Sequence, residues 1–209
     1  MNKQRTVYHL IVDRSGSMSD CIEATINGFN EQLNRINDIA AEFSEQEVRV
    51  GLTLFNDYVN HITISGQLGK VRPLTTENYQ PGGSTALLDA IGASVGVLSE
   101  EEESKSGIPT TFVVVVLTDG HENCSRVFNL EQIRSMIIRL EETGKWTFSF
   151  IGATLDAADV AEQMAFKRQN SYSFNKEDMK GEVWEKLSGS MKSYLDKKRK
   201  GDDLSDFID

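Results

Sequence analysis

Three oxygen-bearing side chains at alternate positions follow the first apolar stretch of the chain. Asp13, Ser15 and Ser17 come directly after the run at residues 7–12. In a tight turn beyond a buried strand such side chains can converge on one point, and hard divalent cations take oxygen ligands of this kind. Because two of the three are neutral hydroxyls, a bound ion would still accept a carboxylate from outside. The pattern therefore indicates an adhesive site rather than a catalytic one.

A further carboxylate stands where the same site could recruit it. Asp119 follows the apolar run at residues 111–117, and a glycine-rich loop lies at residues 65–84. A continuous run of that kind is typical of a strand buried on both faces in the middle of a parallel sheet. Parallel strands present their carboxyl ends at one edge, where ligands collect. We therefore expect Asp13 and Asp119 at the same edge.

The elements that must position these residues alternate between apolar runs and helical stripes. The sequence predicts strands at residues 6–12, 48–55, 58–64, 111–117, 146–151 and 171–174. It predicts helices near residues 22–43, 87–98, 130–140, 156–165 and 183–194. Strands separated by helices imply an α/β fold, with a doubly wound, mostly parallel central sheet and helices on both faces.

Two local signals refine this arrangement. Asn56-Asp57 is typical of a tight turn, so the second and third strands should form a hairpin. Asp20 is expected to cap the first long helix, with Glu23 as its partner in the first turn.

Length and composition favour one soluble domain, because the 209 residues are 39% hydrophobic and 26% charged. The net charge of −10 argues against nucleic acid as a partner, since phosphate binding needs clustered basic residues. No apolar run is long enough to span a bilayer and no signal-peptide core is present, so we expect a cytoplasmic protein without a membrane partner. The domain is expected at residues 1–196, followed by a charged, flexible tail at residues 197–209.

Three pieces follow one another along the chain: Asp13-Arg14-Ser15-Gly16-Ser17-Met18, Gly83-Ser84-Thr85-Ala86-Leu87-Leu88-Asp89-Ala90 and Leu117-Thr118-Asp119-Gly120. In these pieces and their order the chain resembles von Willebrand factor A-type (VWA) domains, in the intracellular form found among bacterial and phage-encoded proteins. It implies a Rossmann-like central sheet of about six strands with one antiparallel edge hairpin.

The resemblance also implies a metal-ion-dependent adhesion site. Ser15, Ser17 and Thr85 would offer hydroxyls to the ion, while Asp13 and Asp119 would act largely through bridging waters and hydrogen bonds. Carboxylates held back in this way leave the ion electrophilic. An acidic side chain of a partner protein would then complete its coordination.

The sequence also leads to expectations for the bound ion and for the residues around the site. Mg²⁺ is expected from its availability, with Mn²⁺ or Ca²⁺ as alternatives for the same oxygen ligands. Thr85 has the right spacing to Leu87 and Asp89, but Ser84 is adjacent and also carries a hydroxyl. The expected rim that touches the partner consists of Arg14, Met18, Ser84 and His121.

Two cysteines, Cys21 and Cys124, are predicted to be free thiols in a cytosolic protein, and neither lies in a zinc-binding spacing. The resemblance places the strands that precede them side by side. The two thiols could therefore form a redox-sensitive pair at the metal edge.

Other chemistry has little support in the sequence. His121-Glu122-Asn123 lacks the second histidine of a zinc-protease motif, and neither a nucleophile elbow nor a P-loop is present. We therefore expect a metal-dependent protein–protein interaction module, not an enzyme. Two alternatives stay open: a metal-dependent hydrolase or phosphotransferase with His121 as base, and a scaffold subunit with a purely structural metal. Asp13 and Ser17 could also be helix caps, and Asp119-Gly120 an ordinary turn.

Overall fold

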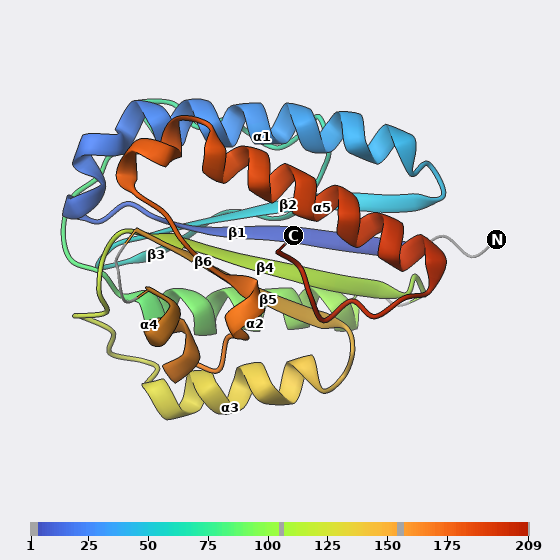
Figure 1. Cartoon of the computed structure of the whole chain (residues 1–209). Coiled ribbons are helices and arrows are strands. Elements are labelled where there is room, and N and C mark those ends of the chain that lie inside the picture. The colour runs from blue at the N-terminus through green and yellow to red at the C-terminus, as the bar shows by residue number, and fades with distance from the viewer. Residues whose placement is uncertain (1–3, 105–106, 154–156, 209) are drawn as a thin grey trace.

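A six-stranded sheet forms the centre of the computed structural model, which describes residues 4–104, 107–153 and 157–208 (Figure 1). The strand order is β3-β2-β1-β4-β5-β6. Only the β2–β3 pair is antiparallel, which confirms the predicted mostly parallel sheet with an edge hairpin. The strands are β1 (Gln4–Asp13), β2 (Gln46–Phe55), β3 (Val59–Gln67), β4 (Thr110–Thr118), β5 (Trp146–Gly152) and β6 (Ser171–Ser173).

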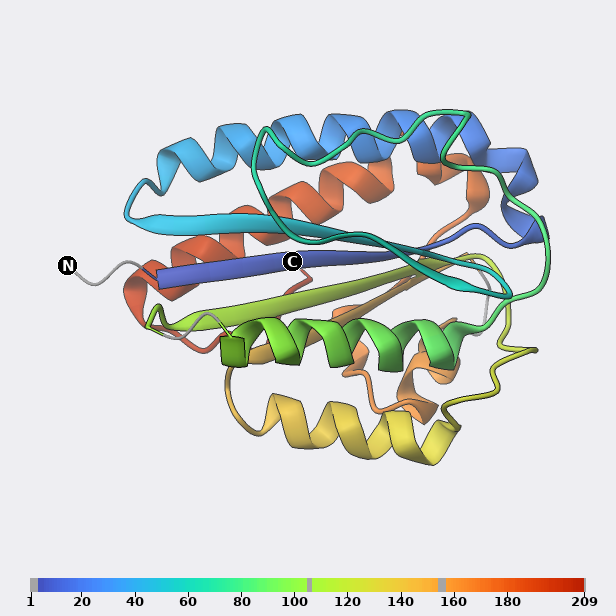
Figure 2. The same cartoon turned by 180° about the vertical axis from the view of Figure 1, so that it is seen from behind.

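Helices cover both faces of the sheet. One face carries α1 (Ile22–Glu42) and α5 (Glu182–Lys200), and the other carries α2 (Leu87–Ser104), α3 (Leu130–Glu141) and α4 (Ala157–Gln163), as Figures 1 and 2 show from opposite sides. The predicted start of the fourth helix at Asp156 lies outside the described residues. Of the described helices, none combines the length and the apolar character needed to cross a membrane.

The apolar run of β4 serves two separate cores. Val113, Val115 and Leu117 belong to the core under α1 and α5, while Val114 and Val116 belong to the core under the other helices. Successive side chains of a strand point to opposite faces. A central strand that is covered on both faces therefore needs the continuous apolar run that the sequence contains.

The strand order also fixes where a ligand would bind. From β1 the chain passes through α1 to β2 on one side, and β4 occupies the other side of β1. The carboxyl ends of β1 and β4 therefore lie at a topological switch point, where open α/β sheets place their binding sites.

The C-terminal segment differs from the predicted flexible tail. Helix α5 continues to Lys200 and ends at Gly201, whose φ of 78° is left-handed. The chain then returns to the sheet and buries Phe207 completely, against the rings of Tyr8 and Tyr194. The Asn170 side chain bonds the backbone of this segment at the Phe207 N–H (2.7 Å) and the Ser205 carbonyl (2.8 Å). The burial of this aromatic ring is favourable and anchors the segment together with these hydrogen bonds.

A buried polar network crosses the sheet at His9. The Nε2 atom of His9 lies 2.8 Å from the Thr53 hydroxyl, and the Nδ1 atom of His9 lies 3.2 Å from the Ile64 carbonyl. The Thr53 hydroxyl also accepts a bond from the Ser94 hydroxyl (3.1 Å). Burial lowers the pKa of His9 to about 4, against the smaller opposing effect of the Ile64 carbonyl.

Acid should weaken the fold through His9. In the unfolded chain the imidazole protonates near pH 6.5, whereas the folded protein keeps it neutral down to about 4. The stabilisation that the neutral His9 provides is therefore complete above pH 6.5. As the pH falls towards 4 it is lost, and the free energy of unfolding decreases by about 3 kcal/mol. Urea unfolding of wild type and His9→Gln between pH 4 and 7, without divalent cations, measures it.

The comparison with His9→Gln isolates this residue. Burial raises the pKa of Asp13 to about 6, so that carboxyl works in the opposite direction, but it is present in both proteins. A smaller acid-induced loss in His9→Gln is the expected result. Equal slopes of stability against pH in the two proteins would contradict it.

Candidate metal site

Asp13 lies at the end of β1, where hydrogen bonds fix both its carboxylate and its backbone carbonyl. Its Oδ1 accepts a bond from the Ser15 N–H (2.6 Å), and its Oδ2 accepts one from the Thr118 hydroxyl (2.5 Å) at the end of β4. The phenol of Tyr79 donates to the Asp13 carbonyl oxygen (2.7 Å). The carboxylate is therefore fixed between the two central strands.

The two serines connect Asp13 to Asp119. The hydroxyls of Ser15 and Ser17 lie 3.0 Å apart, and the Ser17 hydroxyl donates to Oδ1 of Asp119 at 2.5 Å. Both serines belong to the turn that opens the 3₁₀-helix η1 (Gly16–Cys21), which separates β1 from α1. One short turn thus brings residues from two strand ends into one hydrogen-bonded group.

Gly120 leaves a small oxygen-lined space beside this group. A Cβ atom built on Gly120 would lie 2.9 Å from the Thr85 Oγ1, and 3.4 Å from both the Asp13 Oδ2 and the Ser17 Oγ. These three oxygens come from two segments, the turn after β1 and the loop before α2, and Gly120 adds a third segment at the end of β4. Hydroxyl and carboxylate oxygens are the ligands that Mg²⁺ prefers, so the residues present fit a hard divalent cation.

The electrostatics of Asp13 agree with a cation at this place. Burial raises the pKa of Asp13 to about 6, against the hydrogen bonds from Thr118 and Ser15 that favour the charged form. Within the described part of the chain, no basic side chain forms an ion pair with Asp13. A cation in the adjacent space would supply the missing positive charge.

The Thr85 hydroxyl oxygen lies beside Gly120 with the Asp13 and Ser17 oxygens, and the loop that carries it is held at two points. The Thr85 N–H donates to the Asn123 side chain (2.9 Å), and the Asn123 N–H donates to the Thr85 carbonyl (3.1 Å). The Ser84 N–H instead donates to the carboxylate of Asp57 (3.0 Å) in the turn between β2 and β3. Asn123 and Asp57 therefore hold the glycine-rich loop in place from both sides.

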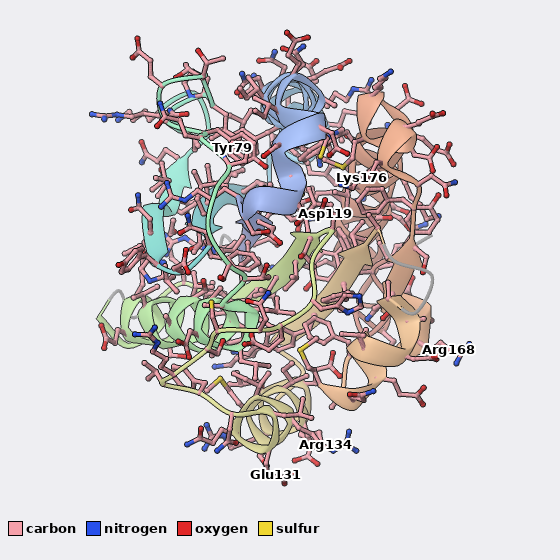
Figure 3. The ribbon with its side chains drawn as sticks, turned by 90° about the vertical axis from the view of Figure 1, so that its left-hand side faces the viewer. Tyr79, Asp119, Glu131, Arg134, Arg168 and Lys176 are labelled. Carbon is pink, nitrogen blue, oxygen red and sulfur yellow. The ribbon has the colours of Figure 1, made fainter. Side chains whose placement is uncertain are left out.

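Lys176 is a residue of this site that no sequence pattern indicated. Its ammonium lies 2.7 Å from Oδ2 of Asp119 and donates to the Ser17 carbonyl (2.8 Å) and to the Asp20 carboxylate (2.9 Å). Figure 3, which looks at this edge of the sheet, shows Lys176 and Asp119 close together beside η1. Partial burial opposes the charged form, but the bonds to Asp119 and Asp20 outweigh it and raise the pKa of Lys176.

The prediction that Asp20 caps the first long helix was wrong. The helix α1 begins with Cys21 at its N-cap position and has no side-chain capping bond there. Asp20 lies within η1 and binds Lys176 instead. The 3₁₀ turn displaces the start of the helix, so the capping pattern read from the sequence falls one residue too early.

The residues predicted for the rim are not all at the surface. His121 is exposed, and Arg14 and Ser84 are half-buried. Met18 is completely buried, so its prediction as a rim residue was wrong. The η1 turn directs the Met18 side chain into the core, where its sulfur lies 3.9 Å from the Cys21 sulfur.

Both cysteines are free thiols in the structure. Cys21 is buried and donates to the Met18 carbonyl (3.4 Å), while Cys124 is half-buried in the loop after β4. Asp20, Cys21 and Asp119 each place one potential ligand atom within 4.8 Å of the others. The Lys176 ammonium forms ion pairs with both carboxylates of these three residues, so a positive charge already lies beside them.

The fold agrees with comparisons to known proteins. A sequence profile of the von Willebrand factor type A domain matches residues 9–187. The chain belongs to this family. Domains of the VWA family are metal-dependent adhesion and interaction modules. A search of curated protein sequences gave no match.

Solved structures of other proteins resemble this protein in fold, at low sequence identity. The PilB minor pilin from Streptococcus sanguinis is 12% identical over 92% of this chain and 62% of its own, with a TM-score of 0.63. The vWF domain of the pilus tip protein Mfa5 from Porphyromonas gingivalis is 7% identical over 93% and 97%, with a TM-score of 0.60.

A third solved structure carries zinc at its own metal-ion-dependent adhesion site (MIDAS). Proximal thread matrix protein 1 from the mussel byssus, with a zinc-occupied MIDAS motif, is 16% identical over 90% of this chain and 46% of its own, with a TM-score of 0.55. This chain therefore spans less than half of the mussel protein's length.

Proposed function

We propose that this protein binds a divalent cation, Mg²⁺ in the cell, and uses it to hold an aspartate or glutamate of a partner protein. The observation that carries the proposal is the space beside Gly120, lined by oxygens of Asp13, Ser17 and Thr85. Ser15 and Asp119 would orient these ligands through the bonds they share with Ser17. The bound ion would supply the positive charge that attracts the partner's carboxylate.

The surface around the site suits a protein partner. Tyr58 and Val127 are 76% and 72% exposed, although both are apolar. Tyr58 follows Asp57, which bonds the Ser84 N–H, and Val127 belongs to the loop that holds Thr85 through Asn123. We propose that these two side chains add apolar contact area to the partner that the ion holds. A cytoplasmic location stays a prediction from the sequence.

Thr85→Ala should remove metal-dependent binding of acidic peptides. A random peptide library displayed on phage is selected on the wild-type protein in Mg²⁺ and eluted with EDTA. We expect each selected peptide to contain one essential Asp or Glu, whose amide variant binds at least about tenfold more weakly, because a charged ligand of the ion is lost. Thr85→Ala should bind none of these peptides, as measured by calorimetry in Mg²⁺.

The conservative variant and two further measurements separate the alternatives. Thr85→Ser keeps the hydroxyl and should retain binding, so loss in both variants would point to misfolding. A selection that yields no peptide on elution with EDTA, or yields peptides that bind without any Asp or Glu, would contradict the proposal. Metal-dependent turnover of a phosphate ester would favour the hydrolase. Unfolding by EDTA alone would favour a purely structural metal.

A further inference from the structure

Lys176 occupies a position that a cation would also favour. Three oxygen-bearing groups surround its ammonium: the Asp119 carboxylate, the Asp20 carboxylate and the Ser17 carbonyl, at 2.7 to 3.1 Å. Two of these groups belong to residues that take part in the candidate metal site. Lys176 reaches them from η3 (Lys176–Lys180), which directly precedes α5 and lies 159 residues from Ser17 in sequence.

We propose that Lys176 is an internal competitor of the divalent cation, which neutralises Asp119 in the metal-free protein and lowers the affinity of the site for metal. The inference rests on the proposed function, because it concerns the same site. Metal binding then exchanges one positive charge for another, and the protein remains stable in either state.

The charges of the site support this competition. Asp13 and Asp119 carry the two negative charges that a divalent ion needs, and Lys176 cancels one of them. Ser17 donates to Oδ1 of the Asp119 carboxylate, while the buried Oδ2 accepts no hydrogen bond from the residues that the structure describes and forms an ion pair with Lys176. The Lys176 ammonium therefore repels an incoming cation, which must displace it from Oδ2 of Asp119. Solvent limits the effect, since 38% of the Lys176 side chain is exposed.

A purely structural role for Lys176 predicts the opposite result. A lysine that only holds the site together would, when removed, weaken the site and its affinity for metal. A competitor, when removed, leaves a site with tighter metal binding but lower stability without metal. The sign of the change in affinity therefore distinguishes the two roles.

The experiment compares Mn²⁺ binding by wild type, Lys176→Met and Lys192→Met, measured by electron paramagnetic resonance of the free ion. We expect Lys176→Met to bind Mn²⁺ about tenfold more tightly, because the ammonium no longer opposes the ion. Lys192 pairs with Glu42 on the outer side of α5, so Lys192→Met removes the same charge away from the site and should bind like wild type. Lys176→Arg keeps the charge and should remain near the wild-type affinity.

Thermal unfolding gives a second, independent readout. In EDTA we expect Lys176→Met to unfold at a lower temperature than wild type, because Asp119 loses its counter-ion. Saturating Mn²⁺ should raise the unfolding temperature of Lys176→Met by more than that of wild type. If Lys176→Met does not fold, Lys176→Gln replaces it, with the same expectations.

Each outcome has a defined meaning. Tighter binding by Lys176→Met, including binding by the variant alone, supports the competition. Binding by wild type with equal or weaker binding by Lys176→Met overturns the inference and leaves the proposed function intact. If neither protein binds Mn²⁺ at millimolar concentration, the proposed function fails and the inference fails with it.

Discussion

Gly120→Ala is expected to abolish divalent cation binding while the protein stays folded. The added methyl group would enter the space between the Thr85 Oγ1, the Asp13 Oδ2 and the Ser17 Oγ, at 2.9 to 3.4 Å from each. An ion cannot share this space with a carbon atom, so we expect affinity for Mg²⁺ to fall by at least about 100-fold. Isothermal titration with Mg²⁺ and Mn²⁺ measures the loss, and circular dichroism confirms the fold.

Gly82→Ala provides the matched control. Gly82 lies in the neighbouring glycine-rich loop, and a Cβ atom built there meets no atom within 4 Å. The backbone bonds of Gly82 to Arg14 and Asn56 do not involve a side chain of its own, so alanine can keep them. We expect wild-type metal affinity in this variant. Retained affinity in Gly120→Ala would mean that the ion binds elsewhere.

Gly28→Ala is expected to destabilise the protein strongly, because the added methyl group would collide with a buried indole. Gly28 lies in α1, and a Cβ atom there would be 1.9 Å from Nε1 of Trp184 and 2.2 Å from its Cδ1. The indole is buried and donates to the Met179 carbonyl (3.0 Å), so it has little room to move. We expect the free energy of unfolding to fall by about 3 kcal/mol. The unfolding temperature should fall by about 10 °C in a calorimetric scan.

Two comparisons test the cause of this loss. Gly96 lies in α2 and is exposed, with no atom within 4 Å of a built Cβ, so Gly96→Ala should gain up to about 1 kcal/mol from helix propensity. Trp184→Leu replaces the indole with a shorter side chain that has no ring atoms in place of Nε1 and Cε2. The double variant Gly28→Ala/Trp184→Leu should therefore lose less stability than the sum of the two single losses. Strict additivity would contradict a direct clash.

The local parts of the site could be predicted from sequence. Asp13, Ser15 and Ser17 lie within one turn after a strand, so their spacing alone brings them together. The alternation of apolar runs and helical stripes likewise predicted the six strands and their mostly parallel sheet. These features depend on neighbours in the chain and on the periodicity of burial, which a sequence shows directly.

The resemblance to VWA domains supplied what local patterns alone did not. Thr85 and Asp119 are far from Asp13 in sequence, and only the order of the family's pieces linked all three. In the structure the oxygens of Asp13 and Thr85 line the same space beside Gly120, and Asp119 joins them through Ser17. The identity of the ion and that of the partner stay predictions, which the metal titrations and the peptide selection test.

The sequence by itself determined the elements, the sheet edge and the turn that holds Asp13, Ser15 and Ser17, because each depends on short-range pattern. Only the tertiary structure decided that Lys176 meets Asp119, that Met18 turns into the core, and that Phe207 anchors the C-terminal segment. The physical reason is the same in each case. Such contacts depend on which segments the packed helices bring together across the sheet, and the types and spacing of neighbouring residues do not encode that placement.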